Sequence, residues 1–462
     1  MTPAPKTSPP SDAVRDARRL LRPLRDKIVG LAQALVRVDT VAIPPDGRET
    51  AGQKVLRALL RPYALDVEMY DCGFLERSRH PHVRGDRRYR GRHNLIARTY
   101  GTGGGRSLLL SGHMDTVPTR PNPWRESPWS GTIRAGRLHG RGSWDMKGGL
   151  AAQFAVALAL RKAGVRMAGD LLCESVIDEE FAGGGGMLAG RLRGDNADAC
   201  AIAEGTNHEV VRATRGGHFF DLVCRAGDPM GYFSKEEVVS PALPMGRILG
   251  WIDGWVARRR KVDRGATYAH FKDPAPVQVL ALEANRCDPD VPWSVPLEAR
   301  VRVYFQFLPH EDVPKVVREI EASLSAFCRR DPFFSTHPVE VERLVDPPLL
   351  GHELPADHEW TTCLLGAASG VVGQAARLSA SEWPCDAFIA QHHFGIPTLL
   401  FGPRGGGSHN ANEYVEVPSV LRTAEVYLAA ALEWCGRSAA NSSLSGAEPR
   451  PRRKPPRAGR CT

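Results

Sequence analysis

The spacing of apolar residues predicts helices at both ends of the chain and in its middle. Between Ala13 and Val38 apolar side chains recur every three or four residues, the pattern of one face of an α-helix, so we expect one long helix there. The same spacing predicts helices over residues 49–63, from 148 onward, 313–328 and 417–434. A basic run at 258–261 follows apolar tryptophans and predicts the exposed end of another amphipathic helix.

Short apolar runs predict strands between these helices. They cover residues 65–70, 94–100, 108–110, 170–177, 217–224, 277–282, 297–308 and 398–401, with one more short strand ahead of Glu204. Strands that alternate with helices are typical of an α/β fold, here with a mostly parallel central sheet flanked by helices. Gly101–Gly105 joins two of the strands as a hairpin or a short crossover. It is not a phosphate loop, because no helix bearing Lys-Ser or Lys-Thr follows it.

Length and composition indicate a globular enzyme with more than one domain. A chain of 462 residues exceeds one ordinary core, and 42% hydrophobic with 24% charged residues is the balance of a globular enzyme. The N-terminus lacks an apolar signal core, and no run approaches the roughly 20 apolar residues of a membrane span. The ten cysteines are scattered without a CxxC pair, so we expect free thiols, a cytoplasmic location and no membrane partner.

The positive charge is concentrated in the C-terminal segment. The net charge is +9, but residues 438–462 carry six Lys or Arg against the single acid Glu448. This tail is rich in Pro, Ser, Ala and Gly, which indicates a disordered appendage, with contact to an anionic surface as the alternative. Residues 1–12 are likewise expected to form a disordered arm. Because the rest of the chain is only mildly basic, we do not expect nucleic acid as a partner.

The first candidate site residues follow the apolar strand at 108–110. His113 and Asp115 are two residues apart, so in an extended segment both side chains point to the same side. His113 can then bind a metal while Asp115 accepts the other ring N–H, which fixes the tautomer. Taken alone, such a pair is more often a surface turn or a satisfied core pair than a metal site.

Further acids and a second histidine come at other strand ends. Asp145 stands between a strand-like approach and a helix, where it can reach a metal or merely cap the helix. Three consecutive acids, Asp178 to Glu180, end a buried strand, which is costly unless a cation neutralises them. Glu204 ends another short strand, and His409 lies in a glycine-rich loop after the strand at 398–401.

Together these residues predict a site for two metal ions. Open parallel sheets place their sites outside the carboxyl ends of the strands, where the members of this set all stand: His113, Asp145, Glu180, Glu204 and His409. Two imidazoles and three carboxylates suit a pair of divalent ions with a bridging carboxylate and an open water position. Zinc is the first candidate, with cobalt and manganese as alternatives because divalent affinities of such sites overlap.

Five motifs carry a resemblance to a known family. They are SGHMDTVP (111–118), GRGSWDMKGG (140–149), DEEFAGGGG (178–186), AEGT (203–206) and GPRGGGSHNANEYV (402–415). With these motifs in this order, the chain resembles the zinc-dependent family of aminoacylase, acetylornithine deacetylase, succinyl-diaminopimelate desuccinylase and glutamate carboxypeptidase. The resemblance covers residues 94–217 and 383–435.

The resemblance implies how the metal ligands are shared. Asp145 would bridge the two zinc ions. His113 and Glu204 would complete the ligands of one ion, and Glu180 and His409 those of the other. The peptide bond after Asp145 is often cis in this family.

The resemblance also implies the reaction. Glu179 would act as general base, and Asp115 would orient His113. Zinc lowers the pKa of its bound water to about 7 and polarises the carbonyl, while Glu179 takes the water proton and returns it to the departing amine. The predicted function is hydrolysis of an amide C–N bond in a small N-acyl amino acid or peptide-like metabolite.

The domain organisation follows from the same resemblance. A catalytic domain would occupy residues 13–210 and 339–437, with an α+β lid inserted over 211–338. In relatives such a lid often closes over the substrate and pairs with its twin. We therefore expect a homodimer formed through the lid.

The lid departs from the family where relatives contact the reacting group. Relatives place a His after the first lid strand, where it stabilises the oxyanion, but Gly231 stands there in this chain. Such a donor is worth about 10²–10³ in rate, and Tyr232 or His218 could take its place. Relatives also carry an Arg on the last lid strand that grips a substrate carboxylate, where this chain has Gln306.

The remaining candidates are substrate contacts. Arg215 matches a basic position of the family and is the candidate for binding a substrate carboxylate. Gly405 and Gly406, in the glycine-rich loop, are further candidates. The sequence does not fix the substrate or its acyl group.

Two other functions compete with hydrolysis. The same metal site could run acyl transfer or amide formation, which the altered lid motivates, although no GxSxG-type nucleophile motif supports an acyl-enzyme. A non-catalytic metal-binding protein is the other alternative. It has no physical need for Glu179, a base beside a complete ligand set.

Overall fold

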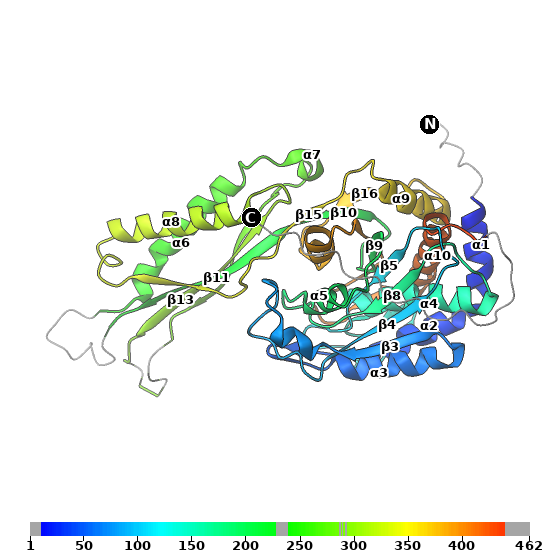
Figure 1. The fold of residues 1–462 in the computed structure, drawn as a ribbon. Coiled ribbons are helices and arrows are strands. Elements are labelled where there is room, and N and C mark those ends of the chain that lie inside the picture. The colour runs from blue at the N-terminus through cyan, green and yellow to red at the C-terminus, as the bar shows by residue number, and fades with distance from the viewer. Residues whose placement is uncertain (1–10, 228–238, 286–287, 289, 292, 439–462) are drawn as a thin grey trace, which may run out of the picture. The chain divides into compact units, whose positions relative to one another are not determined.

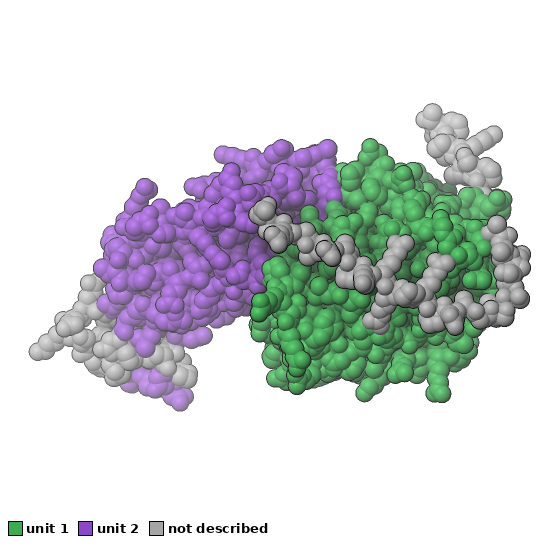
Figure 2. Space-filling view, viewed as in Figure 1, with its two compact units in different colours: residues 1–212, 354–379, 385–462 green, residues 213–353, 380–384 purple. Residues whose placement is uncertain are grey.

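A computed structural model describes residues 11–227, 239–285, 288, 290–291 and 293–438. The chain divides into two units (Figure 2): unit 1 comprises residues 1–212, 354–379 and 385–462, and unit 2 comprises residues 213–353 and 380–384. Almost all of the predicted arm and tail lies outside the described residues. The boundaries of these units differ from those of the predicted domains, whose insert was expected over residues 211–338. The predicted boundaries stay predictions.

Unit 1 is built on a mixed sheet whose central strands are parallel (Figure 1). The order β17-β9-β5-β8 is parallel throughout, whereas β4 is antiparallel to β8, β3 is antiparallel to β4, and β10 is antiparallel to β17. This confirms the predicted α/β class. The bounds are β3 (Asp66–Asp71), β4 (His93–Thr99), β5 (Leu108–Ser111), β8 (Leu171–Ser175), β9 (Ala199–Ile202), β10 (Val210–Thr214) and β17 (Thr398–Leu400), with β15 (His352–Glu353) and β16 (Leu378–Ala380) pairing with β10.

Helices cover this sheet, and α4 is the most deeply buried of them. It contacts β4, β5 and β8, and its residues from Gly148 to Leu160 are all buried. Helix α10 packs on α4, and α1, α2 and α9 pack on α10. The bounds of the helices in this unit are α1 (Asp12–Leu21), α2 (Arg25–Val36), α3 (Glu49–Leu60), α4 (Gly148–Ala163), α5 (Gly185–Leu192), α9 (Glu359–Val372) and α10 (Val417–Trp434).

The single long helix predicted at the start of the chain is wrong. Helix α1 ends at Leu21, a 3₁₀ turn spans Arg22–Leu24, and α2 starts at Arg25. Pro23 lies in that turn, and a proline inside a helix removes one backbone donor and clashes with the carbonyl four residues before it. The helical spacing of apolar residues continues across Arg22–Leu24, so the spacing alone did not indicate a break.

Gly101–Gly105 forms a crossover and not a hairpin. It joins β4 to β5, which are not neighbours, because β8 lies between them in the sheet. Residues 101 and 105 approach the backbone of Ala168 and Gly169 so closely that a Cβ atom would lie within 2.5 Å of backbone atoms there. The glycines therefore serve close backbone packing.

A small antiparallel sheet in unit 1 holds the C-terminal candidate loop. Its order is β18-β19-β7-β6, and the loop bearing His409 connects β18 to β19. The bounds are β6 (Ile133–Arg134), β7 (Arg137–His139), β18 (Gly405–Gly406) and β19 (Tyr414–Glu416), and a separate hairpin is formed by β1 (Ala42–Ile43) and β2 (Asp46–Gly47).

Unit 2 contains an antiparallel sheet covered on one face by two helices. The strand order is β12-β13-β11-β14, and β11 pairs with β13 over ten residues. Buried side chains of β11 and β13 pack against those of α6 and α8 in one apolar core. The bounds are β11 (Gly216–Arg225), β12 (Val277–Glu283), β13 (Glu298–Phe307), β14 (Val339–Arg343), α6 (Ala242–Arg259), α7 (Gly265–Tyr268) and α8 (Val313–Arg330).

One residue of the basic run at the end of α6 differs from expectation. Arg258, Arg260 and Lys261 are exposed as predicted, but Arg259 is buried. Its guanidinium lies 2.5 Å from the carboxylate of Glu311 and donates to the backbone oxygen of Gln306 at 2.9 Å. A buried arginine needs such partners, and sequence spacing alone does not reveal them.

Two further findings concern the sequence expectations about membranes and thiols. Within the part of the chain that the structure describes, no helix has the length and apolar character needed to cross a bilayer. The eight described cysteines are all free thiols, as predicted.

Candidate metal centre

The central sheet of unit 1 brings three segments with candidate residues to one edge. His113 follows β5, Glu179 and Glu180 follow β8, and Glu204 follows β9. Because β5 lies between β8 and β9 and all three are parallel, their carboxyl ends are adjacent. His113 is extended enough to bridge Val176 of the segment after β8, and its side chain is buried.

Asp145 and His409 come to the same place from outside the strand ends. Asp145 lies in the kinked segment Ser143–Lys147, with φ −121° and ψ 86°, directly before α4. It does not cap α4, because the N-cap position is Lys147 and no side-chain cap bond is made there. His409 adopts a left-handed φ of 59° in the loop after β18, so both residues sit in irregular backbone next to regular elements.

The ring of His113 is surrounded by carboxylates. Its Nε2 atom lies 3.1 Å from Oδ1 of Asp145, 3.5 Å from Oε1 of Glu204 and 4.0 Å from Oε2 of Glu179. Ligand atoms of His113, Glu179 and Glu204 lie within 4.8 Å of one another, as do those of His113, Asp145 and Glu180.

His409 faces the other side of Asp145. Its Nε2 atom lies 3.2 Å from Oδ2 of Asp145 and 2.7 Å from Oε2 of Glu180. Asp145 thus directs one carboxylate oxygen to each histidine, Oδ1 to His113 and Oδ2 to His409. Ser408 adds a hydroxyl that donates to Oδ2 of Asp145 at 2.5 Å.

The charge of this cluster suits cations. Burial, with Asp145 beside it, raises the pKa of Glu180 to about 7, and burial raises the pKa of Glu179 well above its usual range. Carboxylates held together away from water are costly unless positive charge neutralises them. Imidazole nitrogens and carboxylate oxygens are ligands that divalent zinc, cobalt and manganese accept, so the residues present fit a pair of such ions.

Asp115 contacts both the histidine and the acids after β8. The Nδ1 atom of His113 lies 2.9 Å from the backbone oxygen of Asp115 and 3.6 Å from its Oδ1, so the backbone oxygen is the nearer acceptor. The other carboxylate oxygen accepts the backbone N–H groups of Glu179 at 2.9 Å and Glu180 at 3.0 Å. One buried carboxylate therefore fixes the backbone of both glutamates.

An arginine cluster, Arg84, Arg87 and Arg92, holds the turn that carries these glutamates. Arg87 donates from Nε to the Asp178 carboxylate at 3.1 Å and from Nη2 to the backbone oxygen of Phe181. Arg84 donates to the backbone oxygen of Ala182 at 3.1 Å. Arg92 lies 3.4 Å from Asp178 and forms a second, buried ion pair with Glu49.

This turn contains backbone that needs support. Asp178 has φ 63° and Ala182 has φ 57°, in the left-handed region that non-glycine residues rarely adopt. Such conformations cost on the order of 1–3 kcal/mol each and persist only where surrounding contacts determine them. The arginine cluster supplies those contacts on both sides of Glu179 and Glu180.

Glu413 is a residue of the site that the sequence analysis did not single out. Its fully buried carboxylate accepts the backbone N–H groups of Gly142, Trp144 and Asp145 at 2.9 to 3.0 Å and pairs with Arg141 at 2.8 Å. It therefore holds the segment in which Asp145 lies. The only signal in the sequence was an acid within the last motif, four residues after His409. The Asp145–Met146 peptide bond is cis, as the resemblance implies.

The candidate substrate contacts lie in different places. Arg215, in unit 2, is buried and donates to the side-chain oxygen of Gln306 at 2.7 Å and the backbone oxygen of Asp273 at 2.8 Å. Gly405 packs so closely on Trp144 and Tyr414 that a Cβ atom would lie within 2.6 Å of both, and Gly406 precedes the loop of His409. His218 is buried on β11. Gly231 and Tyr232 lie outside the described residues.

Comparison with known proteins identifies relatives that match most of the chain. A model described as Peptidase family M20/M25/M40 matches residues 109–433. The N-formyl-4-amino-5-aminomethyl-2-methylpyrimidine deformylase of Halalkalibacterium halodurans is 25% identical over 448 residues, which cover 89% of this chain and 95% of the relative. The succinyl-diaminopimelate desuccinylase of Methylobacterium sp. (strain 4-46) is 27% identical over 345 residues, which cover 72% and 81%. The crystal structure of human carnosine dipeptidase 1 shares the fold, with a TM-score of 0.70, 15% identity and coverage of 92% of this chain and 100% of that one.

The contacts of Glu413 predict a large effect on stability. Glu413→Ala leaves the Arg141 guanidinium and three backbone N–H groups buried without their acceptor, so the free energy of unfolding should fall by about 3–5 kcal/mol, as for breaking a buried ion pair. Urea titration measures the loss. Glu416→Ala is the matched control, because the Glu416 side chain makes no cap hydrogen bond at the start of α10 and its loss should cost no more than about 1 kcal/mol. Equal losses in both variants would contradict the role of Glu413.

Proposed function

The chain belongs to peptidase family M20/M25/M40, and on that premise we propose that it is a two-metal hydrolase that cleaves an amide C–N bond of a small N-acyl substrate. The family resemblance expected from the motifs is confirmed, and with it the metal-dependent amidohydrolase class. One observation carries the two-metal part of the proposal: the two oxygens of Asp145 face two different histidines.

The proposed ligand sets follow the contacts around these histidines. His113 and Glu204 hold one ion, Glu180 and His409 hold the other, and Asp145 lies between them. When bound, divalent ions of this kind activate water and polarise a carbonyl group. Zinc is the proposed ion, because imidazole and carboxylate ligands with an open position are characteristic of catalytic zinc.

Glu179 is the proposed general base. Its carboxylate lies beside His113, and its backbone is fixed by Asp115 next to that of the ligand Glu180. A carboxylate at this place can take a proton from the attacking water and deliver it to the departing amine. The chain thus holds the proposed base Glu179 and the proposed ligand Glu180 at adjacent positions. The Glu179 carboxylate lies beside His113, and that of Glu180 lies beside His409.

The substrate class rests on the named relatives and on Arg215. Two relatives are named for removing formyl and succinyl groups from nitrogen, which supports an N-acyl substrate. Arg215 is buried but makes no ion pair with a described carboxylate, because its acceptors are the Gln306 amide and backbone oxygens. We propose that it binds a carboxylate of the substrate.

Two further properties complete the proposal. The free thiols of the eight described cysteines favour a reducing, cytoplasmic location. Strand β12 is an edge strand of unit 2 with apolar side chains exposed, Val279 at 45%, Leu280 at 49% and Leu282 at 56%. An exposed apolar edge favours pairing with another chain, so we propose a homodimer through this sheet.

The first prediction concerns catalysis. Metal-loaded wild type should release amine from at least one member of a panel of N-formyl, N-acetyl and N-succinyl amino acids and dipeptides. Glu179→Gln should keep the metal and lose about 10²–10⁴-fold in kcat, the usual contribution of a general base. Glu433→Gln, a remote exposed carboxylate, is the control. No turnover of any member by metal-loaded wild type would favour acyl transfer or amide formation.

The second prediction concerns metal content. Mass spectrometry of metals should find two divalent ions per wild-type chain, one in His409→Ala, and fewer than one in Asp145→Ala, because only Asp145 serves both ions. Chelation should abolish turnover, and zinc, cobalt and manganese added back in turn identify the active ion. Full retention of two ions by Asp145→Ala would contradict the bridging role.

The third prediction concerns assembly. Sedimentation velocity should show a dimer for wild type and a monomer for Leu282→Glu, because a charge on the apolar edge opposes pairing. Leu59→Glu places the same change at an exposed leucine of α3 in unit 1 and should leave the dimer intact. A monomeric wild type at tens of micromolar would rule out the dimer.

A further inference from the structure

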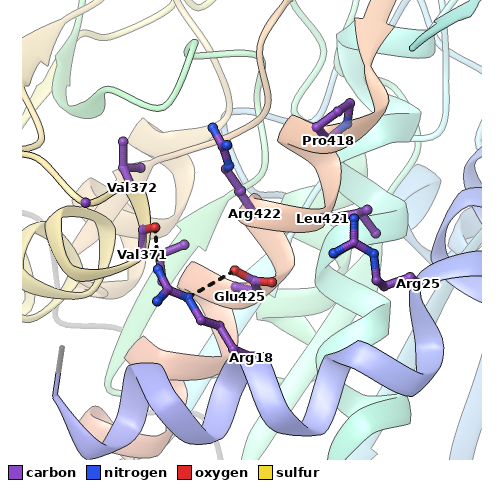
Figure 3. Close-up of a pocket in the computed structure, with 9 residues that line it drawn as sticks. Arg18, Arg25, Val371, Val372, Pro418, Leu421, Arg422 and Glu425 are labelled. Carbon is purple, nitrogen blue, oxygen red and sulfur yellow. Dashed lines mark hydrogen bonds and ion pairs between the residues drawn. The ribbon is translucent and has the colours of Figure 1, made fainter.

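A cavity in unit 1, apart from the candidate metal centre, is lined by three arginines. It has a volume of about 430 Å³ and lies where the first helices, the end of α9 and the start of α10 meet (Figure 3). Arg18 comes from α1, Arg25 from the start of α2 and Arg422 from the second turn of α10. The remaining lining residues are Val371, Val372, Gly373, Pro418, Leu421 and Glu425.

Positive charge exceeds negative charge in this arginine pocket. Glu425 is its one carboxylate, and only Arg18 pairs with it, at 3.7 Å. Arg18 also donates to the backbone oxygens of Val371 at 2.8 Å and Gly370 at 3.4 Å, and so satisfies the last carbonyls of α9. Three guanidiniums and one carboxylate leave an excess of two positive charges.

Arg25 and Arg422 are the groups left for a ligand. Neither makes a hydrogen bond or ion pair with the other residues drawn in Figure 3. Both are exposed, yet both act on the half-buried Glu425: burial raises the pKa of that carboxyl, and the charges of Arg18, Arg25 and Arg422 oppose the rise. All three arginines line the same cavity, and the charges of all three act on Glu425.

The chemistry of the pocket selects a class of ligand. Guanidinium groups present forked N–H donors that match the oxygens of phosphate and carboxylate, and they cannot ligate a metal. The start of α10 adds the positive end of a helix dipole beside Arg422. We propose that the arginine pocket binds a small, doubly charged oxyanion of the phosphate type, held by Arg25 and Arg422 while Arg18 remains engaged with α9.

Binding of inorganic phosphate tests this proposal independently of any hydrolase activity. Isothermal titration with the metal-loaded enzyme, at ionic strength fixed with sodium chloride, should show saturable binding of phosphate. Arg25→Gln and Arg422→Gln should each weaken it at least tenfold, and the double variant should lose it. Arg57→Gln, an exposed arginine of α3 outside the pocket, should bind like wild type.

Binding measurements with other anions distinguish this pocket from nonspecific anion binding and from binding at the metal centre. Sulfate should compete with phosphate, a phosphate monoester should bind if the pocket takes a phosphorylated metabolite, and acetate should not bind because it carries one charge. Retention of phosphate binding in the double variant would overturn the proposal and locate the anion elsewhere, for example at the metal centre. Absence of saturable binding to wild type at about 10 mM would also overturn it.

Discussion

The mutual repulsion of buried carboxylates is the constraint around which unit 1 is arranged. Asp145, Glu179, Glu180 and Glu204 converge within a few ångströms at the carboxyl edge of the central sheet, together with the imidazoles of His113 and His409. Carboxylates so placed favour separation or protonation in the absence of cations. The fold must therefore hold the acids together mechanically, and the proposed metal ions would supply the compensating charge.

The carboxylates are held in place by neighbouring residues that bond to the backbone of the cluster residues or of the segments next to them. Asp115 fixes the backbone of both glutamates, the arginine cluster holds the left-handed turn around them, and Glu413 holds the segment of Asp145. Asp115 and Glu413 accept backbone N–H groups, and Arg84 and Arg87 donate to backbone oxygens. The cluster is thus positioned through its main chain, which leaves the carboxylate oxygens available for ligands.

The candidate residues at strand ends could be predicted from the sequence. The residues that hold these candidates in position could not. His113, Glu180 and Glu204 could be predicted because they follow apolar runs, and short-range periodicity shows where such runs end. Glu413 and the arginine cluster could not, because their partners lie tens to hundreds of residues away in the chain. The break at Pro23 was visible in the sequence, but an uninterrupted apolar stripe on both sides outweighed it.

All the residues proposed to ligate metal or move a proton belong to unit 1, whereas Gln306, one of the expected departures from the family pattern, belongs to unit 2. The chain enters unit 2 within β10 and leaves it after β15, so its whole sheet and helices are inserted between segments of the catalytic unit. The ion pairs that join His113 and His409 to the carboxylate cluster are all made between residues of unit 1. Under the proposal that Arg215 of unit 2 binds the substrate, changes in the inserted unit would alter substrate choice while the residues proposed for the reaction stay in unit 1.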